Sequence, residues 1–429
     1  MNVIKYPCRE EWDELLRRPV MNVDTLREVV RTVLDDVREG GDEAVKMYER
    51  KFDKVELDCL AVSDAEMEEA ERLVPEELKD ALRLAHDNIE KFHAAQRFET
   101  RKVEVCPGVT CWQKAVPIEK VGLYIPGGTA PLFSTVLMLA TPAKIAGCRE
   151  IVLCTPPGKD GKVHPAILCA ARIAGVSRIY KAGGVQAIGA MAYGTQSIPK
   201  VYKIFGPGNQ YVMAAKQQVS LHDVAIDMPA GPSEVEVLAD ATSRPEFVAA
   251  DLLSQAEHGA DSQVLLVSTD EALLEKVQAE VARQLEVLPR KEIAEKALSH
   301  SRLVLVKDMD EAMELTNRYA PEHLIIETAD YMAAAERVIN AGSVFLGSYT
   351  PESAGDYASG TNHTLPTNGY ATAYSGVNLD SYHRKVTFQE LTPEGVARIG
   401  RAVEIMAAGE MLDAHKNAMT LRLKTLKTE

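Results

Sequence analysis

Two short segments carry carboxylate, amide and imidazole side chains at spacings that suit metal or acid–base chemistry. In DLLSQAEHG, residues Asp251, Gln255 and His258 stand at i, i+4 and i+7, so a helix would carry all three on one face beside Gly259. Such a face could offer nitrogen and oxygen donors to a cation, and a solvated polar face is the alternative interpretation.

In APEHLIIE, Glu322 and His323 stand directly before an apolar strand. Neighbours in an extended segment point to opposite sides, so we do not expect both side chains to lie in the core. A carboxylate beside an imidazole could divide general acid–base work. A polar pair at the entry of a strand is the alternative.

Further candidates lie late in the chain. Asp356 and His363 fall in the Gly-rich stretch PESAGDYASGTNHTLPTNGYA, and Glu410 and His415 fall in AAGEMLDAHKNA. The seven cysteines form no CxxC pair and stop at Cys169, which argues against a disulfide framework and favours a reducing, cytoplasmic setting. Any metal site is therefore expected to use His, Asp, Glu or Gln ligands.

Glycine-rich turns suggest a second kind of site. Close backbone approach at glycine and the N-terminus of a following helix suit a phosphate group. Four turns of this kind are read as strand-to-helix connections: Pro126-Gly127-Gly128-Thr129, Ala182-Gly183-Gly184-Val185-Gln186, Gly206-Pro207-Gly208-Asn209 and Gly231-Pro232-Ser233. None is a GxGxxG followed by an acidic residue about twenty positions on, so the set indicates a dinucleotide without proving one. Tight turns without a ligand remain the alternative for any one of them.

The elements that must position these residues follow an α/β pattern. Residues 22–98 have helical periodicity, with Ser63 and Glu66 as a capping box. Strands of about five residues alternate with helices across 119–230, and a second such series runs to about residue 346. The segment from Thr392 to Glu429 is expected to be helical and too short for a core of its own. It must therefore pack on the body of the chain or on a partner.

Composition excludes several classes of protein. The 429 residues carry a net charge of −15, which disfavours binding to nucleic acid or to an anionic membrane. The most apolar stretch, STVLMLATPAKIAG, is too short to span a bilayer, and the first residues lack the apolar core of a signal peptide.

Together, these segments resemble the histidinol dehydrogenase family over essentially the whole chain. The resemblance lies in VGLYIPGGTAPLFSTVLMLATPAKIAGC, AGGVQAIGAMAYGT, FGPGNQYVMAAK, DMPAGPSE, DLLSQAEHG, YAPEHL, GDYASGTNHTLPT and DAHKNA. It implies a zinc-dependent enzyme, with one Zn²⁺ per subunit, that oxidises L-histidinol to L-histidine through the aldehyde. Two NAD are reduced in succession, in the final step of histidine biosynthesis.

The resemblance also implies roles for individual residues. Glu322 and His323 would be the catalytic acid–base pair. The zinc ligands would be Gln255, His258, Asp356 and His415. Substrate contacts would come from Ser233, Gln255, His258, His323, Asp356, His363, Glu410 and His415, and NAD contacts from Tyr124, Gln186 and Asn209. The family is a homodimer with an intertwined C-terminal tail, which would place Glu410 and His415 of one chain in the site of the other.

The expected fold is α/β, with two incomplete, doubly wound, Rossmann-like parallel-sheet domains, N-terminal helices and a helical C-terminal tail. The expected division is an N-terminal arm (1–21), a helical part of the first α/β domain (22–124), an inserted NAD-binding domain (125–231), the remainder of the first domain with the metal and substrate site (232–376) and a helical dimerisation tail (377–429).

Three rival functions stay open at this point. A paralogue could oxidise another small amino- or sulfo-alcohol with NAD. A metal-dependent hydrolase could use the same ligands with Glu322 activating water, and it would need no dinucleotide. A non-catalytic nucleotide-binding or scaffold protein would leave Glu322, His323 and Asp356 without a role.

Overall fold

The computed structural model describes residues 1–19, 23–127 and 130–426, which form two compact units. The first unit comprises Met1–Ala95 and Ile118–Ser381, and the second comprises Gln96–Pro117 and Tyr382–Glu429. Gly128 and Thr129 of the first predicted turn, residues 20–22 and the last three residues of the tail lie outside the described residues.

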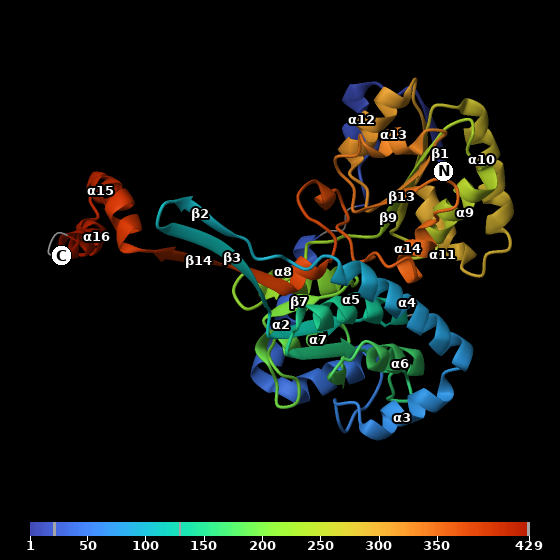
Figure 1. Cartoon of the computed structure of the whole chain (residues 1–429). Coiled ribbons are helices and arrows are strands. Elements are labelled where there is room, and N and C mark those ends of the chain that lie inside the picture. Colours follow the sequence, from blue (N-terminus) through green and yellow to red (C-terminus); the bar gives the residue numbers. More distant parts are fainter. Residues whose placement is uncertain (20–22, 128–129, 427–429) are drawn as a thin grey trace. The chain divides into compact units, whose positions relative to one another are not determined.

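The strands of the first unit form two parallel sheets (Figure 1). The five-stranded sheet has the order β6-β5-β4-β7-β8 and the six-stranded sheet the order β1-β11-β10-β9-β12-β13. The strands are β1 (Asn2–Lys5), β4 (Lys120–Tyr124), β5 (Glu150–Thr155), β6 (Arg178–Lys181), β7 (Lys203–Phe205), β8 (Ala225–Ile226), β9 (Glu234–Ala239), β10 (Gln263–Ser268), β11 (Arg302–Leu305), β12 (His323–Glu327) and β13 (Ser343–Leu346).

Helices cover both faces of each sheet. They are α1 (Trp12–Leu15), α2 (Val23–Tyr48), α3 (Asp64–Leu73), α4 (Glu76–Ala94), α5 (Phe133–Ala146), α6 (Pro165–Ile173), α7 (Gly184–Tyr193), α8 (Gln210–Ser220), α9 (Pro245–Ala256), α10 (Glu271–Leu285), α11 (Lys291–Ser299), α12 (Met309–Tyr319), α13 (Tyr331–Ala335) and α14 (Glu352–Tyr357). A short π-helix, η2 (Glu49–Asp53), continues α2.

Burial follows from the sequence pattern. The interior strands of a parallel sheet are covered on both sides, and accordingly every residue of β9, β10 and β12 is buried. One face of the six-stranded sheet packs on α9, α10 and α11, and the other face on α1, α12 and α13. This arrangement confirms the predicted fold class.

The N-terminal helices pack mainly on the helices of the five-stranded sheet. Their contacts run to the helices of the five-stranded sheet: α2 packs on α7 and α8, α3 on α6, and α4 on α5 (Figure 1). Val30, Leu34 and Val37 of α2 share a core with Ile188 and Met191 of α7. The capping box of Ser63 and Glu66 at the start of α3 is confirmed.

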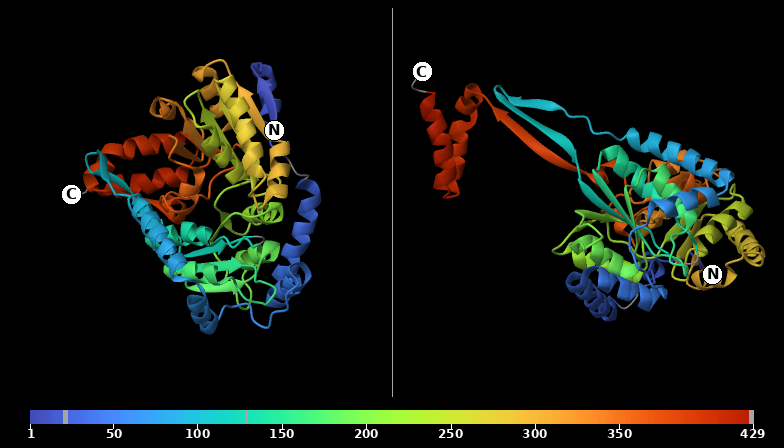
Figure 2. Two further views of the ribbon diagram at one scale, coloured as in Figure 1. Left: turned by 90° about the vertical axis from the view of Figure 1, so that its right-hand side faces the viewer. Right: turned by 90° about the horizontal axis from the view of Figure 1, so that it is seen from below.

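The second unit is not all helical. The strands β2 (Lys102–Cys106), β3 (Val109–Pro117) and β14 (His383–Leu391) form an antiparallel sheet of order β14-β3-β2. The helices α15 (Pro393–Gly409) and α16 (Asp413–Thr425) follow as a hairpin (Figure 2). The prediction of helix from 377 was therefore wrong at β14, which pairs with β3 along nine residues and contains the strand-favouring residues Val386, Thr387 and Phe388.

Among the described helices, none combines the length and apolarity that crossing a bilayer requires.

Candidate active site

The predicted catalytic pair lies at the amino edge of the six-stranded sheet. His323 is the first residue of β12 and pairs in register with Val235 of β9, so Glu322 and His323 lie beside the start of β9. Both side chains are buried, at 5% and 3% exposure. The expectation that one of them would avoid the core was wrong, because the end of a strand buried on both faces leaves neither direction exposed.

The backbone of Glu234 holds both residues. Its N–H donates to Oε2 of Glu322 at 2.9 Å, and its carbonyl oxygen lies 3.2 Å from Nδ1 of His323. A carbonyl only accepts, so Nδ1 of His323 carries the proton and Nε2 is left for chemistry. The side chain of Glu234 is in turn held by an ion pair with Arg18.

Three carboxylates surround the imidazole of His323. Its Nδ1 lies 3.7 Å from Glu322 Oε2 and 3.8 Å from Glu352 Oε1, and its Nε2 lies 3.6 Å from Asp356 Oδ1. Burial lowers the pKa of His323, but Glu352, Glu322 and Asp356 together raise it well above its ordinary value.

Burial also perturbs these carboxyl groups. It raises the pKa of Glu322 to about 8 and that of Glu352 well above its ordinary value. Burial acts in the same direction on Asp356, but the imidazoles of His323, His363 and His258 outweigh it and hold the Asp356 pKa below its usual value. Asp356 therefore favours its ionised form more strongly than Glu322 and Glu352 do.

Several buried polar atoms here are unsatisfied. Oδ1 of Asp356, Nε2 of His323 and both carboxyl oxygens of Glu352 have no hydrogen-bond partner among the described residues. Leaving buried polar atoms unpaired costs about 1–3 kcal/mol each, so such a group points to a bound proton, cation or ligand. His323, Glu352 and Asp356 bring potential ligand atoms within 4.8 Å of one another.

Gln255 and His258 adjoin this group. Gln255 lies in the last turn of α9, fully buried, and its Nε2 is 3.2 Å from Nδ1 of the exposed His258. Oε1 of Gln255 finds no partner within the described part of the chain. Desolvation lowers the pKa of His258 and Asp356 raises it, which places that imidazole in the field of the same carboxylate. Residues of the two predicted segments, DLLSQAEHG and APEHLIIE, thus lie near the same carboxylate, Asp356. His258 itself lies just beyond the end of α9.

Asp251, the third member of that predicted helix face, faces elsewhere. It is buried against Glu327, and burial raises the pKa of Asp251 to about 8 and that of Glu327 to about 7.

His363 connects this group to the five-stranded sheet. Its Nδ1 lies 2.9 Å from the carbonyl oxygen of Asp356, so Nδ1 donates and Nε2 accepts the hydroxyl proton of Thr135, 3.1 Å away in the first turn of α5. Desolvation lowers the pKa of His363. The predicted substrate contact Ser233 is half-buried directly before β9.

Glu410 and His415 belong to the second unit, at the end of α15 and in α16, where both side chains are exposed. Their contact with the substrate or metal stays a prediction.

The predicted dinucleotide contacts lie at the carboxyl edge of the five-stranded sheet. Tyr124 ends β4 and its hydroxyl accepts from Gly184 N–H at 3.0 Å. Gln186 is fully buried in the first turn of α7. Asn209 is the exposed N-cap of α8, and its side-chain oxygen accepts from Tyr211 N–H and Val212 N–H at 3.0 and 3.1 Å.

Three of the four glycine-rich turns lead into helices at this edge, namely those before α5, α7 and α8. The fourth was predicted wrongly: Gly231-Pro232-Ser233 lies between β8 and β9 and joins the two sheets. Its sequence resembles the other turns because glycine and proline mark a change of direction in either setting.

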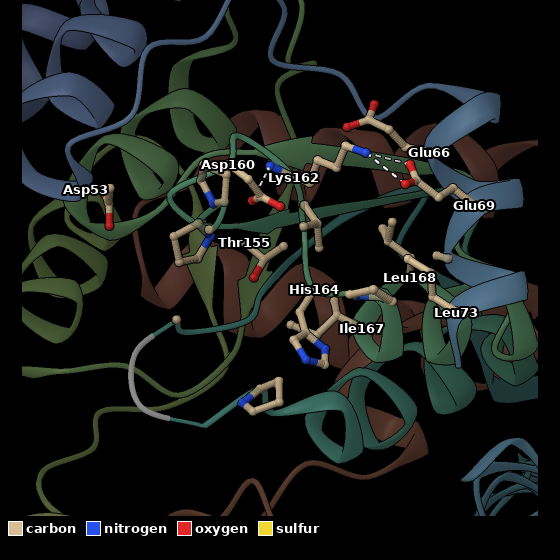
Figure 3. Close-up of a pocket in the computed structure, with 18 of the residues that line it drawn as sticks. Asp53, Glu66, Glu69, Leu73, Thr155, Asp160, Lys162, His164, Ile167 and Leu168 are labelled. Carbon is tan, nitrogen blue, oxygen red and sulfur yellow. Dashed lines mark hydrogen bonds and ion pairs between the residues drawn. The ribbon is translucent and has the colours of Figure 1, made fainter. Parts of the chain in front are cut away.

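A cavity of about 510 Å³ opens beside the first of these turns and the connection between β5 and α6 (Figure 3). Its wall includes Asp53, Gly127, Thr155, Pro156 and Lys162. Pro156 also packs against Gly127 and Gly183, where an added Cβ would come within 2.2 and 2.7 Å of it. Glycine is required at both turns because the proline fills the space of a side chain.

The sequence-based interpretation missed Glu352 and Glu49. Glu352 stands four residues before Asp356, a spacing that places both on one face of a helix and was available as a signal. Glu49 accepts from Gly183 N–H and from Gln186, more than a hundred positions along the chain, and no local pattern marks it.

Comparison with known proteins agrees with the geometry. A family model described as histidinol dehydrogenase matches residues 16–423. The chain is 71% identical to a histidinol dehydrogenase of Bacteroides thetaiotaomicron over 427 residues, covering 100% of both chains. It is 51% identical to one from Escherichia coli over 423 residues, covering 98% of this chain and 96% of the relative.

A solved structure of this family has the same fold. The crystal structure of histidinol dehydrogenase from Elizabethkingia anophelis matches with a TM-score of 0.98 and 54% identity, over 100% of this chain and 99% of that one. A buried acid–base group on the matching fold, together with full-length identity well above 30%, identifies this chain as an oxidoreductase of the histidinol dehydrogenase family.

Proposed function

We propose that this chain oxidises L-histidinol to L-histidine through the aldehyde, with two NAD reduced in succession. The single observation that carries the proposal is the buried group at the amino edge of the six-stranded sheet, where Glu322 and His323 face Asp356. Full-length similarity to histidinol dehydrogenases supports the choice of substrate and makes this the final step of histidine biosynthesis.

The donor set at this group fits Zn²⁺. Gln255 Oε1 and Asp356 Oδ1 are buried acceptors that lack a partner among the described residues, and His258 adds an imidazole nitrogen. Nitrogen and oxygen ligands without sulfur suit a zinc site that keeps room for substrate. We propose Gln255, His258 and Asp356 as three ligands and His415 of the partner subunit as the fourth. When bound, zinc would supply an anchor for the imidazole and amine of the substrate, and the nicotinamide of NAD would supply the hydride acceptor.

His323 is the proposed base for the alcohol. Because its Nδ1–H is committed to the carbonyl of Glu234, Nε2 of the neutral imidazole accepts the hydroxyl proton as hydride leaves the carbon. The imidazolium that forms is stabilised by Glu352 and Asp356. The substrate loses one proton and one hydride and becomes the aldehyde.

Glu322 is the proposed base for the second half-reaction. Its ionised carboxylate, which the pKa raised to about 8 makes a stronger base, would take a proton from water as the oxygen adds to the aldehyde carbon. The hydrate then loses a second hydride and a proton to give the acid. Enclosure of both bases at one strand end lets a single bound substrate pass through both steps.

The test is stoichiometry on purified protein. We expect two NADH per histidine formed and loss of both products after treatment with a chelator, with recovery on adding Zn²⁺. Turnover of another small amino- or sulfo-alcohol in preference to histidinol would contradict the substrate assignment. Product formation without NAD would contradict the dehydrogenase chemistry.

The second unit supports a homodimer with an intertwined tail. Its exposed apolar side chains include Val103, Val105, Phe388, Met406 and Leu421. Few of its described side chains are buried, so a partner surface would give this unit the core that it lacks. We propose that Glu410 and His415 act in the site of the partner subunit.

Mixed dimers test this exchange. Glu322→Gln and His415→Asn dimers should each form no histidine, whereas co-expressed mixed dimers should recover histidine formation at one site of two. Recovery requires that a site take Glu322 from one chain and His415 from the other. If the mixed dimers form no histidine, each site must take both Glu322 and His415 from the same chain.

We further propose residues 125–231 as the NAD-binding segment and 232–376 as the carrier of the metal and substrate site. A cytoplasmic setting is proposed from the seven cysteines, which are all unpaired.

A further inference from the structure

A buried carboxylate from the N-terminal helices holds the turn before α7. Glu49 is fully buried at the start of η2. Its Oε1 accepts two hydrogen bonds of 2.8 Å each, from the backbone N–H of Gly183 and from Nε2 of Gln186. Helix α2 brings this acid to the carboxyl edge of a sheet from outside the strand-and-turn series.

These bonds fix which way the amide of Gln186 points. Its NH₂ group is directed at Glu49, so its oxygen faces the other way. That Oε1 is buried and has no hydrogen-bond partner in the described ranges of the chain. An unpaired buried carbonyl-type oxygen is unfavourable, and such an oxygen is expected where a ligand supplies the missing donor.

The backbone at this helix start is already satisfied. Gly183 N–H is taken by Glu49 and Gly184 N–H by the hydroxyl of Tyr124. The first turn of α7 therefore does not offer these N–H groups to a phosphate, as the glycine-rich turn alone suggests. What it offers is the side-chain oxygen of Gln186.

Glu49 is also connected to the cavity of Figure 3 through Asp53, the last residue of η2. Burial raises the pKa of Glu49 to about 7 and also raises that of Asp53, and the two carboxyl groups interact. Oε1 of Glu49 accepts the same two bonds whether or not the other oxygen is protonated. The hold on Gln186 therefore does not depend on that proton.

We propose that Glu49 is a positioning residue for the dinucleotide, which keeps Gln186 turned so that its oxygen accepts a hydrogen bond from a hydroxyl or amino group of the nucleotide. The inference rests on the proposed function, because it takes Gln186 as a dinucleotide contact. It adds a residue from the N-terminal helices to the nucleotide site of this chain.

The experiment is a double-mutant cycle read by calorimetric titration of NAD and of ADP-ribose into zinc-loaded protein. Glu49→Ala and Gln186→Ala should each weaken binding about tenfold, the scale of one hydrogen bond to a ligand. The double variant should bind no more weakly than Gln186→Ala alone, because Glu49 acts through that residue. Loss with both ligands assigns the donor to the ADP-ribose half, and loss with NAD alone assigns it to the nicotinamide half.

A conservative variant separates positioning from charge. Glu49→Gln keeps an acceptor for both bonds and should bind NAD within about twofold of the parent protein. In steady state, Glu49→Ala should raise the KM for NAD and leave the KM for histidinol and kcat unchanged. Glu56→Gln is the matched control, because Glu56 is exposed, pairs with Arg50 and should change nothing.

Three outcomes would overturn the inference. One is additive loss in the double variant, another is binding as weak in Glu49→Gln as in Glu49→Ala, and the third is unchanged binding in Glu49→Ala. If Glu49→Ala does not fold, Glu49→Ser replaces it in the cycle. The serine side chain is too short for its hydroxyl to reach Gln186. Failure of the parent protein to bind NAD would instead refute the proposed function, and the inference with it.

Discussion

At the amino edge of the six-stranded sheet, Asp356, His323 and Glu352 keep buried atoms that lack a partner among the described residues. At the carboxyl edge of the five-stranded sheet, the turn N–H groups of Gly183, Gly184 and Gly206 all have partners within the chain. His363 and Thr135 join the two edges. One edge thus leaves carboxylate and imidazole atoms unsatisfied, and the other fixes these turn N–H groups and leaves the amide oxygen of Gln186 among its unpaired atoms.

This difference shows how the two halves of one reaction can be held apart. Groups that change protonation need unsatisfied, buried neighbours that can shift their pKa. A nucleotide needs close approach to a rigid surface, which glycine turns with satisfied N–H groups provide. Substitutions at the amino edge of the six-stranded sheet should therefore alter the rate of the chemical steps. Substitutions at the carboxyl edge of the five-stranded sheet should alter nucleotide binding or the stability of the protein.

The largest expected effect is at Glu322. In Glu322→Gln, aldehyde oxidation should fall about 10²–10⁴-fold, the usual contribution of a general base, while alcohol oxidation continues. Rapid mixing should then show one NADH per site and accumulated aldehyde, trapped with a carbonyl reagent. Equal loss of the first hydride transfer would mean that Glu322 and His323 do not divide the work.

A smaller kinetic effect is expected at Glu352. Glu352→Gln removes the carboxylate 3.8 Å from Nδ1 of His323 and with it a stabiliser of the imidazolium. We expect kcat for alcohol oxidation to fall about tenfold with little change in the KM for NAD. Glu352→Asp should recover part of the rate. If only the KM for NAD changed, Glu352 would act in nucleotide binding, and the chemical steps could not be assigned to the amino edge of the six-stranded sheet on its account.

At the other edge, Gly206→Ala should cost stability. Gly206 has φ of 131°, and an added Cβ would come within 2.1 Å of the carbonyl oxygen of Tyr124. We expect a loss of about 2–4 kcal/mol in the free energy of unfolding, measured by denaturant titration, since neither atom can move freely. Gly409→Ala, which meets nothing within 4 Å, is the control. Unchanged stability in Gly206→Ala would contradict a rigid carboxyl edge.

The smallest expected effect tests a buried acid away from both edges. Burial raises the pKa of Glu236 to about 8, while Thr316 donates to one of its oxygens. An acid with a raised folded-state pKa contributes stability below its unfolded value of 4.5, and that contribution is lost as pH rises to about 8. Glu236→Gln should therefore be nearly neutral at pH 5 and stabilise by about 1–2 kcal/mol at pH 9.

Thermal unfolding across this pH range checks the prediction. Thr316→Val is the matched control, because it removes the hydrogen bond and keeps the acid. A Glu236→Gln variant with the same pH dependence as the parent protein would show that the carboxyl group is not titrating as described.

Part of the candidate site could be predicted because some of its residues are close in sequence. Gln255 and His258 are separated by one helical turn, and Glu322 and His323 are adjacent, so local geometry brings each pair together. The alternation of strands and helices predicted the two parallel sheets. The mistakes arose where a local pattern has two meanings, as at Gly231, or where a distant strand decides the structure, as at β14.

The sequence by itself determined the two α/β series, the kinds of side chain available to a metal, and the family. It did so because hydrophobic periodicity, turn residues and long specific motifs are properties of neighbouring positions. The tertiary structure alone decided that the proposed catalytic pair lies at an amino edge, that Glu352 faces His323, and that Glu49 turns the amide of Gln186. These are contacts between segments far apart in the chain, and only packing in three dimensions fixes which buried atoms find partners and which remain for a ligand.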